Sequence, residues 1–397
     1  MSANLATLFL LDPEVTFLNH GSYGACPRPV FEVYQRWQQQ LERQPVAFLD
    51  PNRGLSGWMR DARVAMAALV GAAPDDLVGL TNATTGLNIV AQSLPLRPGD
   101  EILMTDHEYA ALEKTWAYVC RRSGAVVKTV RIPLPLTDEA QFTDAVLSGM
   151  TGRTRVLFLS HITSATALVF PVERAVAAAR ARGIWTVIDG AHTPGHIALD
   201  LDALGADFYA GNCHKWMMAP KGAAFLHVRP EWQGLLNPLV ISHGWTPDAA
   251  LPGTKGGFGN SPFIDGLEMQ GTRDPSAWLS VPAAIDFARQ HDWPRVADQC
   301  RHLVQHTAAR VAALTGLPGL SSPVFCAPQM VSMPVTQCDP LALQRALIDR
   351  YGIEIPCFNW QGHSIVRVSA QGYNTQGQMD LLVTALTDLL PPLSASV

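Results

Sequence analysis

The region between residues 77 and 228 alternates short apolar runs with longer stretches that carry the spacing of a helix. The run 156–161, Val-Leu-Phe-Leu-Ser-His, is apolar except at its end, as in a strand buried on both faces of a parallel sheet. This alternation predicts an α/β fold with a mainly parallel sheet between helices. The predicted strands are 78–81, 101–105, 126–132, 156–161, 187–192, 206–211 and 222–228. Polar residues cluster where several of these strands end, which is where such sheets bind ligands.

The rest of the chain is less regular and predicts a second, smaller domain. Closely spaced glycines indicate a mobile loop over 247–262. From about residue 321, strands and helices alternate again in a compact α+β pattern. A chain of 397 residues is long enough for more than one domain. We therefore predict a large domain over 20–285 and a small α+β domain formed by 1–19 and 286–397.

Two neighbouring strand ends carry residue types that suggest chemistry. Lys215 ends a polar turn after the strand 206–211, in a stretch otherwise poor in charge. Asp189 and His192 lie at the end of the strand before it. Taken singly, such a lysine is more often a solvated or structural residue, and such an aspartate is more often a helix cap. Their combination is less common, and neighbouring motifs add to it.

Another strand end has the character of an anion site. The strand 78–81 runs into Asn-Ala-Thr-Thr-Gly-Leu-Asn at 82–88, which opens a helix. Such a helix start presents free backbone N–H groups and hydroxyls, which suit a phosphate. The alternative is an ordinary capped helix start, because the pattern G-x-x-x-x-G-K is missing. A further strand end, 106–109, adds His107 and Tyr109.

A phosphate turn, a strand-end aspartate and a lysine are the parts that pyridoxal 5′-phosphate requires. A lysine amine forms a Schiff base with the aldehyde of this cofactor. An aspartate pairs with its pyridinium nitrogen and keeps the ring an electron sink. The sequence therefore predicts pyridoxal 5′-phosphate as the cofactor, held by Asp189 and Lys215, and no metal site is expected.

Several motifs carry a resemblance to a known family over nearly the whole chain. They are Phe-Leu-Asn-His-Gly-Ser-Tyr-Gly at 17–24, Thr-Asp-His-Glu-Tyr at 105–109, Asp-Gly-Ala-His-Thr-Pro-Gly at 189–195, Asp-Phe-Tyr-Ala-Gly-Asn-Cys-His-Lys at 207–215, Gly-Thr-Arg-Asp at 271–274 and Arg-Val-Ser at 367–369. In them the chain resembles the fold-type-I pyridoxal phosphate enzymes of the class V aminotransferase and cysteine desulfurase superfamily. Within it, the chain looks most like isopenicillin N epimerase and its relatives. The resemblance implies a large domain with a mainly parallel sheet of the seven-stranded type between helices, and a smaller α+β C-terminal domain.

The resemblance also implies which residues bind the cofactor, namely Ala83, Thr84, His107, Asp189, His192, Asn212, His214, Lys215 and Thr272. Lys215 would hold the cofactor covalently and later move the α-proton of the substrate. His192 would hydrogen-bond the phenolic oxygen of the ring. His107 would stack on the ring face opposite Lys215, with Tyr109 close by. Thr272 would reach a phosphate in the neighbouring subunit, so the expected active form is a homodimer with active sites at the subunit interface.

A small-molecule amino-acid substrate is implied beside the cofactor. Arg367 would pair with the substrate carboxylate, a bidentate contact that lysine makes poorly. The alternative for Arg367 is a surface salt bridge. Asn19, His20 and Tyr23 would line the substrate pocket.

The implied catalytic residues, Lys215, His107 and Tyr109, leave more than one reaction open at the α-carbon. Epimerisation needs a proton donor on the face opposite Lys215, for which His107 or Tyr109 is the candidate. A β-elimination needs an acid for the leaving group, and Tyr109 could supply it, while transamination needs Lys215 to return the proton to the cofactor. The likeness favours an epimerase or racemase of the isopenicillin N epimerase type first. A carbon–sulfur β-lyase of the hercynylcysteine sulfoxide lyase or cysteine desulfurase kind comes second, and an aminotransferase is also open.

Absent motifs narrow these choices. The loop that carries the sulfur-accepting cysteine of desulfurases is not recognisable before Arg367, and Cys357 is interpreted as a buried apolar residue. This argues against persulfide chemistry but leaves open a β-elimination that needs no cysteine. No G-x-G-x-x-G follows the first strand of the sheet, which excludes a nucleotide-dependent dehydrogenase. A noncatalytic relative is least expected, because Asp189, His192 and Lys215 are all present.

Composition bears on partners and location. The net charge is −5 and no basic tail is present, so neither nucleic acid nor a membrane surface is an expected partner. Seven cysteines without a C-x-x-C pair indicate a reducing compartment. The N-terminal residues lack a signal-peptide pattern, and a cytoplasmic location is expected.

Overall fold

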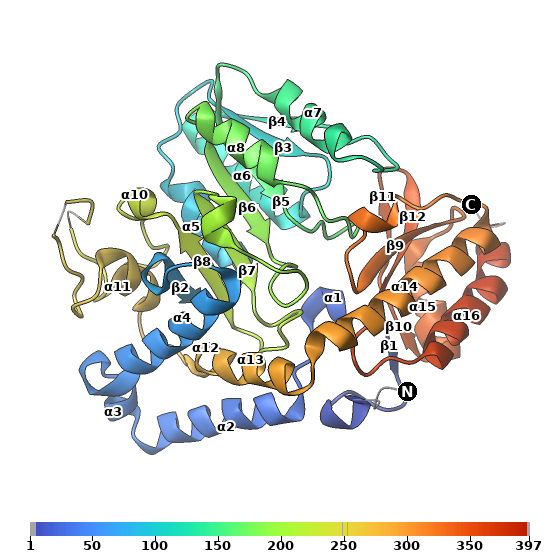
Figure 1. Ribbon diagram of the computed structural model, residues 1–397, viewed down its shortest axis with the longest axis horizontal. Coiled ribbons are helices and arrows are strands. Elements are labelled where there is room, and N and C mark those ends of the chain that lie inside the picture. Colours follow the sequence, from blue (N-terminus) through green and yellow to red (C-terminus); the bar gives the residue numbers. More distant parts are fainter. Residues whose placement is uncertain (1–4, 248, 252, 395–397) are drawn as a thin grey trace.

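A computed structural model describes residues 5–247, 249–251 and 253–394, and a seven-stranded sheet lies at its centre (Figure 1). The sheet has the order β2-β8-β7-β6-β5-β3-β4. Its strands are β2 (Leu77–Leu80), β3 (Glu101–Thr105), β4 (Val126–Val130), β5 (Thr154–Ser160), β6 (Trp185–Gly190), β7 (Phe208–Asn212) and β8 (Ala224–Val228). The pairings are parallel except for the two made by β8, which runs against β7 and β2. The predicted α/β fold with a mainly parallel sheet is confirmed.

Alternate side chains of the strands enter two separate cores, one on each face of the sheet. In β3, Ile102 and Met104 belong to one core and Leu103 to the other. The first core includes residues of α5 (Ala83–Ser93) and α6 (Ala110–Ser123). The second includes residues of α4 (Ser56–Val70), α7 (Glu139–Gly149), α8 (Glu173–Ala181) and α13 (Val281–Gln290). Because successive side chains of a strand point to opposite faces, strands covered on both faces must be apolar throughout, which explains the continuous apolar runs.

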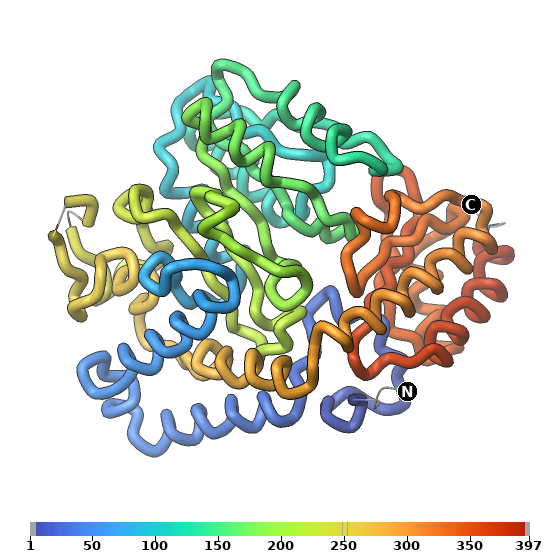
Figure 2. Tube along the Cα trace, in the orientation of Figure 1, coloured from blue at the N-terminus to red at the C-terminus, as the bar shows by residue number. Residues whose placement is uncertain are grey.

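The C-terminal part of the chain forms a separate, smaller sheet. Its antiparallel strands have the order β11 (Cys357–Trp360), β12 (His363–Ser369) and β9 (Met330–Val335). The helices packed with it are α14 (Trp293–Thr315), α15 (Pro340–Tyr351) and α16 (Gln376–Ser394). Figures 1 and 2 show this unit in orange and red beside the large sheet. The predicted small C-terminal domain is confirmed, and the residue boundaries drawn between the two domains stay a prediction.

The N-terminal segment lies between the two sheets. β1 (Thr16–Phe17) pairs in parallel with β10 (Ile353–Glu354) of the C-terminal part. The chain then makes one helical turn, α1 (His20–Tyr23), which Figure 2 shows between the large sheet and the small unit. Gly24, which follows, has φ +70°, and a Cβ there would lie 2.0 Å from the carbonyl oxygen of His214. Glycine is therefore required where the N-terminal segment crosses the turn that carries Lys215.

The remaining helices are mostly short. Before α4 these are a 3-10 turn (Leu5–Leu8), α2 (Arg28–Arg43), α3 (Pro45–Leu49) and a π-helical turn (Pro51–Leu55). After α4 they are two 3-10 turns (Pro74–Asp76 and Pro323–Phe325), α9 (Leu201–Leu204), α10 (Pro230–Gln233), α11 (Pro262–Glu268) and α12 (Ser276–Leu279). The predicted loop 247–262 includes residues 248 and 252, which lie outside the described residues, and its mobility stays a prediction. Across the described part of the chain, no helix combines the length and the apolar character needed to cross a membrane.

Candidate active site

A cavity of about 230 Å³ opens where β5, β6 and β7 end, and residues far apart in the sequence meet in it. The carboxyl ends of parallel strands lie at one edge of the sheet, which is why strand-end residues gather there. The predicted site residues that line this cavity are Tyr23, Ala83, Thr84, Tyr109, Asp189, His192, Asn212, His214, Lys215 and Arg367.

Lys215 follows β7, and its amine lies beside His192. Its Nζ is 3.0 Å from His192 Nε2, and the indole N–H of Trp216 donates to His192 Nδ1 at 3.3 Å. A neutral histidine that accepts at Nδ1 carries its proton on Nε2, so it can donate to an uncharged lysine amine. Burial, aided by the charge of Arg367 and opposed by Asp189, lowers the pKa of Lys215 to about 7. The pair is therefore suited to present a free amine near neutral pH.

Asp189 is a buried carboxylate at the end of β6. It lies next to Ser160 of β5 in the sheet register, and its Oδ1 accepts the N–H of Ala191 at 2.9 Å. Burial raises the pKa of Asp189, although the Ala191 hydrogen bond and the charge of Lys215 oppose that shift. A buried carboxylate that lines a cavity is stabilised by a cationic partner, such as a protonated ring nitrogen.

The N-terminal end of α5 contributes to the cavity at the place predicted to bind phosphate. Asn82 caps the helix, because its Oδ1 accepts the Thr85 N–H at 2.8 Å. The Ala83 N–H donates to Asn212 Oδ1 at 2.8 Å and ties the helix start to the end of β7. His214 also lines the cavity. The ordinary cap is therefore present, and the same helix start supplies the partial positive charge that an anion favours.

Arg367 reaches the cavity from β12 of the small unit. Its Nη1 donates to the Ser164 carbonyl oxygen at 2.6 Å and to the Ser164 hydroxyl at 3.2 Å, while Nη2 donates to Ser22 Oγ at 3.0 Å. The side chain is buried, and Nε has no hydrogen-bond partner within the described residues. Burial lowers the pKa of Arg367 to about 10, so the guanidinium keeps its charge at neutral pH. A buried guanidinium held by two serines rather than by a carboxylate favours an anionic group in the cavity.

The structure separates His107 from Tyr109, which the sequence places side by side. Tyr109 lines the cavity and is 46% exposed, whereas His107 is 1% exposed and does not line it. The His107 ring lies 4.7 Å from the Trp360 ring and 5.3 Å from the Phe170 ring, and its Nδ1 bonds Thr166 Oγ1 at 2.8 Å. Burial among these rings lowers the pKa of His107 to about 4. The predicted place of His107 in the cavity is therefore corrected. Its ring packs against Trp360 and Phe170 outside the cavity, and Tyr109 lines the cavity instead.

Asn19 and His20 do not line the cavity either, which corrects their predicted place. His20 is fully buried, and its Nε2 donates to the carbonyl oxygen of Lys215 at 3.0 Å while Nδ1 accepts from the Tyr373 hydroxyl at 2.9 Å. Asn19 Nδ2 donates to Glu354 at 3.1 Å. His20 therefore supports the backbone of Lys215.

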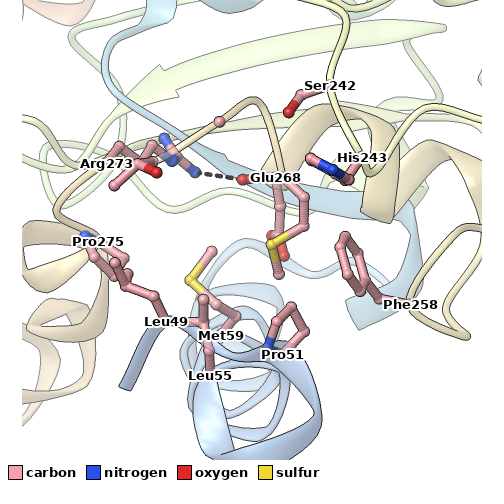
Figure 3. A pocket seen from close by; sticks show the side chains of 13 residues that line it. Leu49, Pro51, Leu55, Met59, Ser242, His243, Phe258, Glu268, Arg273 and Pro275 are labelled. Carbon is pink, nitrogen blue, oxygen red and sulfur yellow. Dashed lines mark hydrogen bonds between the residues drawn. The ribbon is translucent and has the colours of Figure 1, made fainter. Parts of the chain in front are cut away.

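Thr272 lies on a different cavity, of about 310 Å³, which Figure 3 shows from close by. The apolar walls of this second cavity are Leu49, Pro51, Leu55, Met59, Phe258, Met269 and Pro275. On its polar side Arg273 Nη2 donates to the Glu268 carbonyl oxygen at 3.2 Å. Within one chain Thr272 therefore does not line the cavity of Lys215, and its contact with a neighbouring subunit stays a prediction.

Three serines that line the Lys215 cavity are absent from the sequence-predicted site, namely Ser22, Ser160 and Ser164. Ser164 accepts from Nη1 of Arg367. Ser160 lies at the end of a buried strand, as Asp189 does, so its position in the sequence could have identified it as a site residue. Ser22 lies between the predicted residues His20 and Tyr23, and only the helical turn of α1 decides which of these side chains face the cavity.

A family model described as "Aminotransferase class-V" matches residues 28–382. The chain belongs to this family. It is 39% identical to an isopenicillin N epimerase of Amycolatopsis lactamdurans over 98% of both chains. It is 29% identical to a probable chloroplastic L-cysteine desulfhydrase of Arabidopsis thaliana, covering 96% of this chain and 84% of that protein.

Solved structures share the fold. A cysteine desulfurase, CsdA of Escherichia coli, superposes with a TM-score of 0.80 at 23% identity, covering 98% of each chain. A variant of C-DES with glycine covalently linked to its PLP cofactor superposes with a TM-score of 0.79 at 20% identity, covering 95% of this chain and 97% of that one. The fold-type-I architecture predicted from the sequence is confirmed.

The residues of the cavity fit the cofactor that this family indicates, pyridoxal phosphate. The cavity combines a buried carboxylate, Asp189, with a helix start that favours an anion and a lysine whose amine is free near neutral pH. Asp189 would face the ring nitrogen, Lys215 the aldehyde and the start of α5 the phosphate. The cofactor prediction made from the sequence is confirmed.

Proposed function

We propose that this protein is a pyridoxal phosphate-dependent epimerase or racemase that inverts the α-carbon of an amino acid or of a substrate that contains one. The observation that carries the proposal is the cavity itself, where Lys215 and Tyr109 lie with the buried guanidinium of Arg367. Inversion requires two proton-transfer groups around one carbon, and these side chains can supply them. Relatives that are 39% and 37% identical bear the name isopenicillin N epimerase, which supports the same reaction.

Each of these residues has a separate role in the proposed reaction. Arg367 binds the substrate carboxylate and thereby orients the α-carbon. When bound, pyridoxal phosphate withdraws electrons from the bonds of that carbon and acidifies its hydrogen. Lys215, a free amine near neutral pH, moves the α-proton on one side. The Tyr109 hydroxyl is the second proton-transfer group.

A carbon–sulfur β-lyase is the second candidate. The plant relatives named L-cysteine desulfhydrase favour it, and Tyr109 could then protonate the leaving group instead of the α-carbon. A persulfide route is less favoured, because among the described residues no cysteine lines the cavity. Cys357 is buried, and burial raises the pKa of its thiol, which keeps it unreactive.

A screen of amino acids in deuterated water separates the two reactions. We expect the epimerase to place deuterium at the α-carbon and to form the opposite configuration without releasing pyruvate or ammonia. Release of pyruvate would identify the lyase. Lys215→Ala should abolish both the visible cofactor band and the exchange, whereas Lys114→Ala on the exposed face of α6 should change neither. A protein that shows no band even after pyridoxal phosphate is added would contradict both candidates.

A further inference from the structure

A buried carboxylate, Glu108, stands directly before Tyr109, and the proposed reaction leaves it without a role. Its side chain is 7% exposed. Oε1 accepts the Thr105 hydroxyl at 2.7 Å and the Thr105 N–H at 3.4 Å. Oε2 accepts the Ser160 N–H at 2.8 Å and the Ser160 hydroxyl at 2.6 Å. Glu108 therefore bridges the ends of β3 and β5, the two strands from which this side of the cavity is built.

The bridge lies just beyond the point where the backbone pairing of β3 with β5 ends. The paired residues of β3 and β5 end at Met104 and Phe158, so Thr105 and Ser160 lie just beyond the ladder. An ionised carboxylate only accepts hydrogen bonds. Here one oxygen accepts from Thr105 of β3 and the other from Ser160 of β5. Burial raises the pKa of Glu108 to about 7, and the charge of Asp189 adds to that effect. The hydrogen bonds from the Ser160 hydroxyl, the Thr105 hydroxyl and the Ser160 N–H oppose the shift.

The position of the Tyr109 side chain depends on its backbone, because the side chain itself has few restraints. Its side chain is 46% exposed, and within the described residues its hydroxyl makes no hydrogen bond. Its backbone is held from both sides. Behind it, the Thr105 hydroxyl that donates to Glu108 also accepts the His107 N–H at 3.2 Å. Ahead of it, α6 begins, and the Leu112 N–H donates to the Tyr109 carbonyl at 2.8 Å.

We propose that Glu108 is a positioning residue for Tyr109. By joining the ends of β3 and β5, its carboxylate fixes the backbone from which the Tyr109 side chain enters the cavity. The inference rests on the proposed function, in which Tyr109 lines the cavity that holds the cofactor, so that its ring would contact the bound cofactor as well as the substrate. Glu108→Gln keeps the size of the side chain but turns one acceptor into a donor that faces donors, so the bridge opens on one side.

A double-mutant cycle at Glu108 and Tyr109 tests this role. The measured quantity is the apparent dissociation constant of pyridoxal phosphate, followed through the visible band of the holoenzyme. We expect Glu108→Gln to weaken cofactor binding about tenfold when Tyr109 is present, and less than about twofold when Tyr109→Ala has already removed the ring. Glu113→Gln, an exposed glutamate on α6, is the matched control and should leave the constant unchanged.

Equal weakening in both backgrounds would overturn the inference, because Glu108 would then act independently of Tyr109. A folded Glu108→Gln variant with unchanged cofactor affinity would overturn it as well. If Glu108→Gln does not fold, Thr105→Val removes one donor of the bridge and takes its place in the same cycle. The proposed function fails separately, since a protein that never shows the cofactor band contradicts that proposal before any cycle is measured.

Discussion

At the scale of single residues, the buried amine of Lys215 predicts how the rate of cofactor attachment depends on pH. Its pKa is lowered to about 7, and only the uncharged amine attacks an aldehyde. We expect the rate of covalent cofactor attachment to the cofactor-free protein to rise with pH through a midpoint near 7 and then to level off. An unperturbed lysine would keep gaining rate up to about pH 10. Stopped-flow absorbance of the visible band at a series of pH values measures this midpoint.

The positive charge of Arg367 contributes to the lowered pKa of Lys215. A variant without this charge therefore provides a control for the pH midpoint. Arg367→Met removes a positive charge beside the amine, so the midpoint should move to higher pH. Lys114→Ala lies on the exposed face of α6 and should leave it unchanged. A midpoint near 10 in the unsubstituted protein would contradict the assignment of Lys215 as a pre-formed nucleophile.

The residue scale also shows which positions can be predicted from the sequence. The positions of Asp189 and Lys215 were predictable because one lies at the end of an apolar strand and the other just after one, and parallel strands bring such ends together. The choice between His107 and Tyr109 was not predictable. Both follow the same strand, and the rings of Trp360 and Phe170 that hold His107 come from distant parts of the chain. Only tertiary packing decides which side chain turns toward the cavity.

At the scale of elements, a buried ion pair ties α4 to α11 and to β2. Arg63 Nη1 donates to Glu268 Oε2 at 2.6 Å, and both side chains are 1% exposed. Glu268 Oε1 also accepts the Gly79 N–H of β2 at 2.9 Å. Removing one partner leaves the other charge buried and unpaired, so we expect Arg63→Met to lower the free energy of unfolding by about 3–5 kcal/mol. Urea unfolding followed by circular dichroism measures the change.

An exposed pair in the same protein provides the comparison. Arg289 and Asp286 lie 3.0 Å apart, with side chains 75% and 57% exposed. Such a pair contributes at most about 1 kcal/mol, so Arg289→Met should change the unfolding midpoint little. Equal losses from the two substitutions would mean that burial does not set the strength of the Arg63–Glu268 contact.

The strand pattern shows a limit of sequence reasoning at this scale. The apolar run of β8 looks like those of the parallel strands of the sheet, because a strand buried on both faces has the same pattern in either direction. Its direction follows from the connection instead. Residues 213–223 join β7 to β8 without a helix, and a short connection of this kind permits only an antiparallel neighbour.

At the scale of the whole molecule, one exposed segment carries an unusual number of apolar side chains. Leu239, Val240, Ile241 and Trp245 are 44%, 53%, 59% and 41% exposed. The same segment supplies Ser242 and His243 to the cavity of Figure 3, which Thr272 also lines. Exposed apolar groups gathered in this way mark an interaction surface. We propose that two copies of the chain associate here, which would bring Thr272 toward the partner's cofactor as the family resemblance implies.

Sedimentation of the purified protein tests this association. We expect the unsubstituted protein to sediment as a dimer, and Ile241→Asp to weaken the association at least about tenfold, because it would bury an unpaired charge. If Thr272 acts across the interface, the same substitution should also weaken cofactor binding. Leu341→Asp, on α15 at the opposite side of Figure 1, changes an equally exposed leucine and should affect neither property. A dimer that survives Ile241→Asp unchanged would place the interface elsewhere.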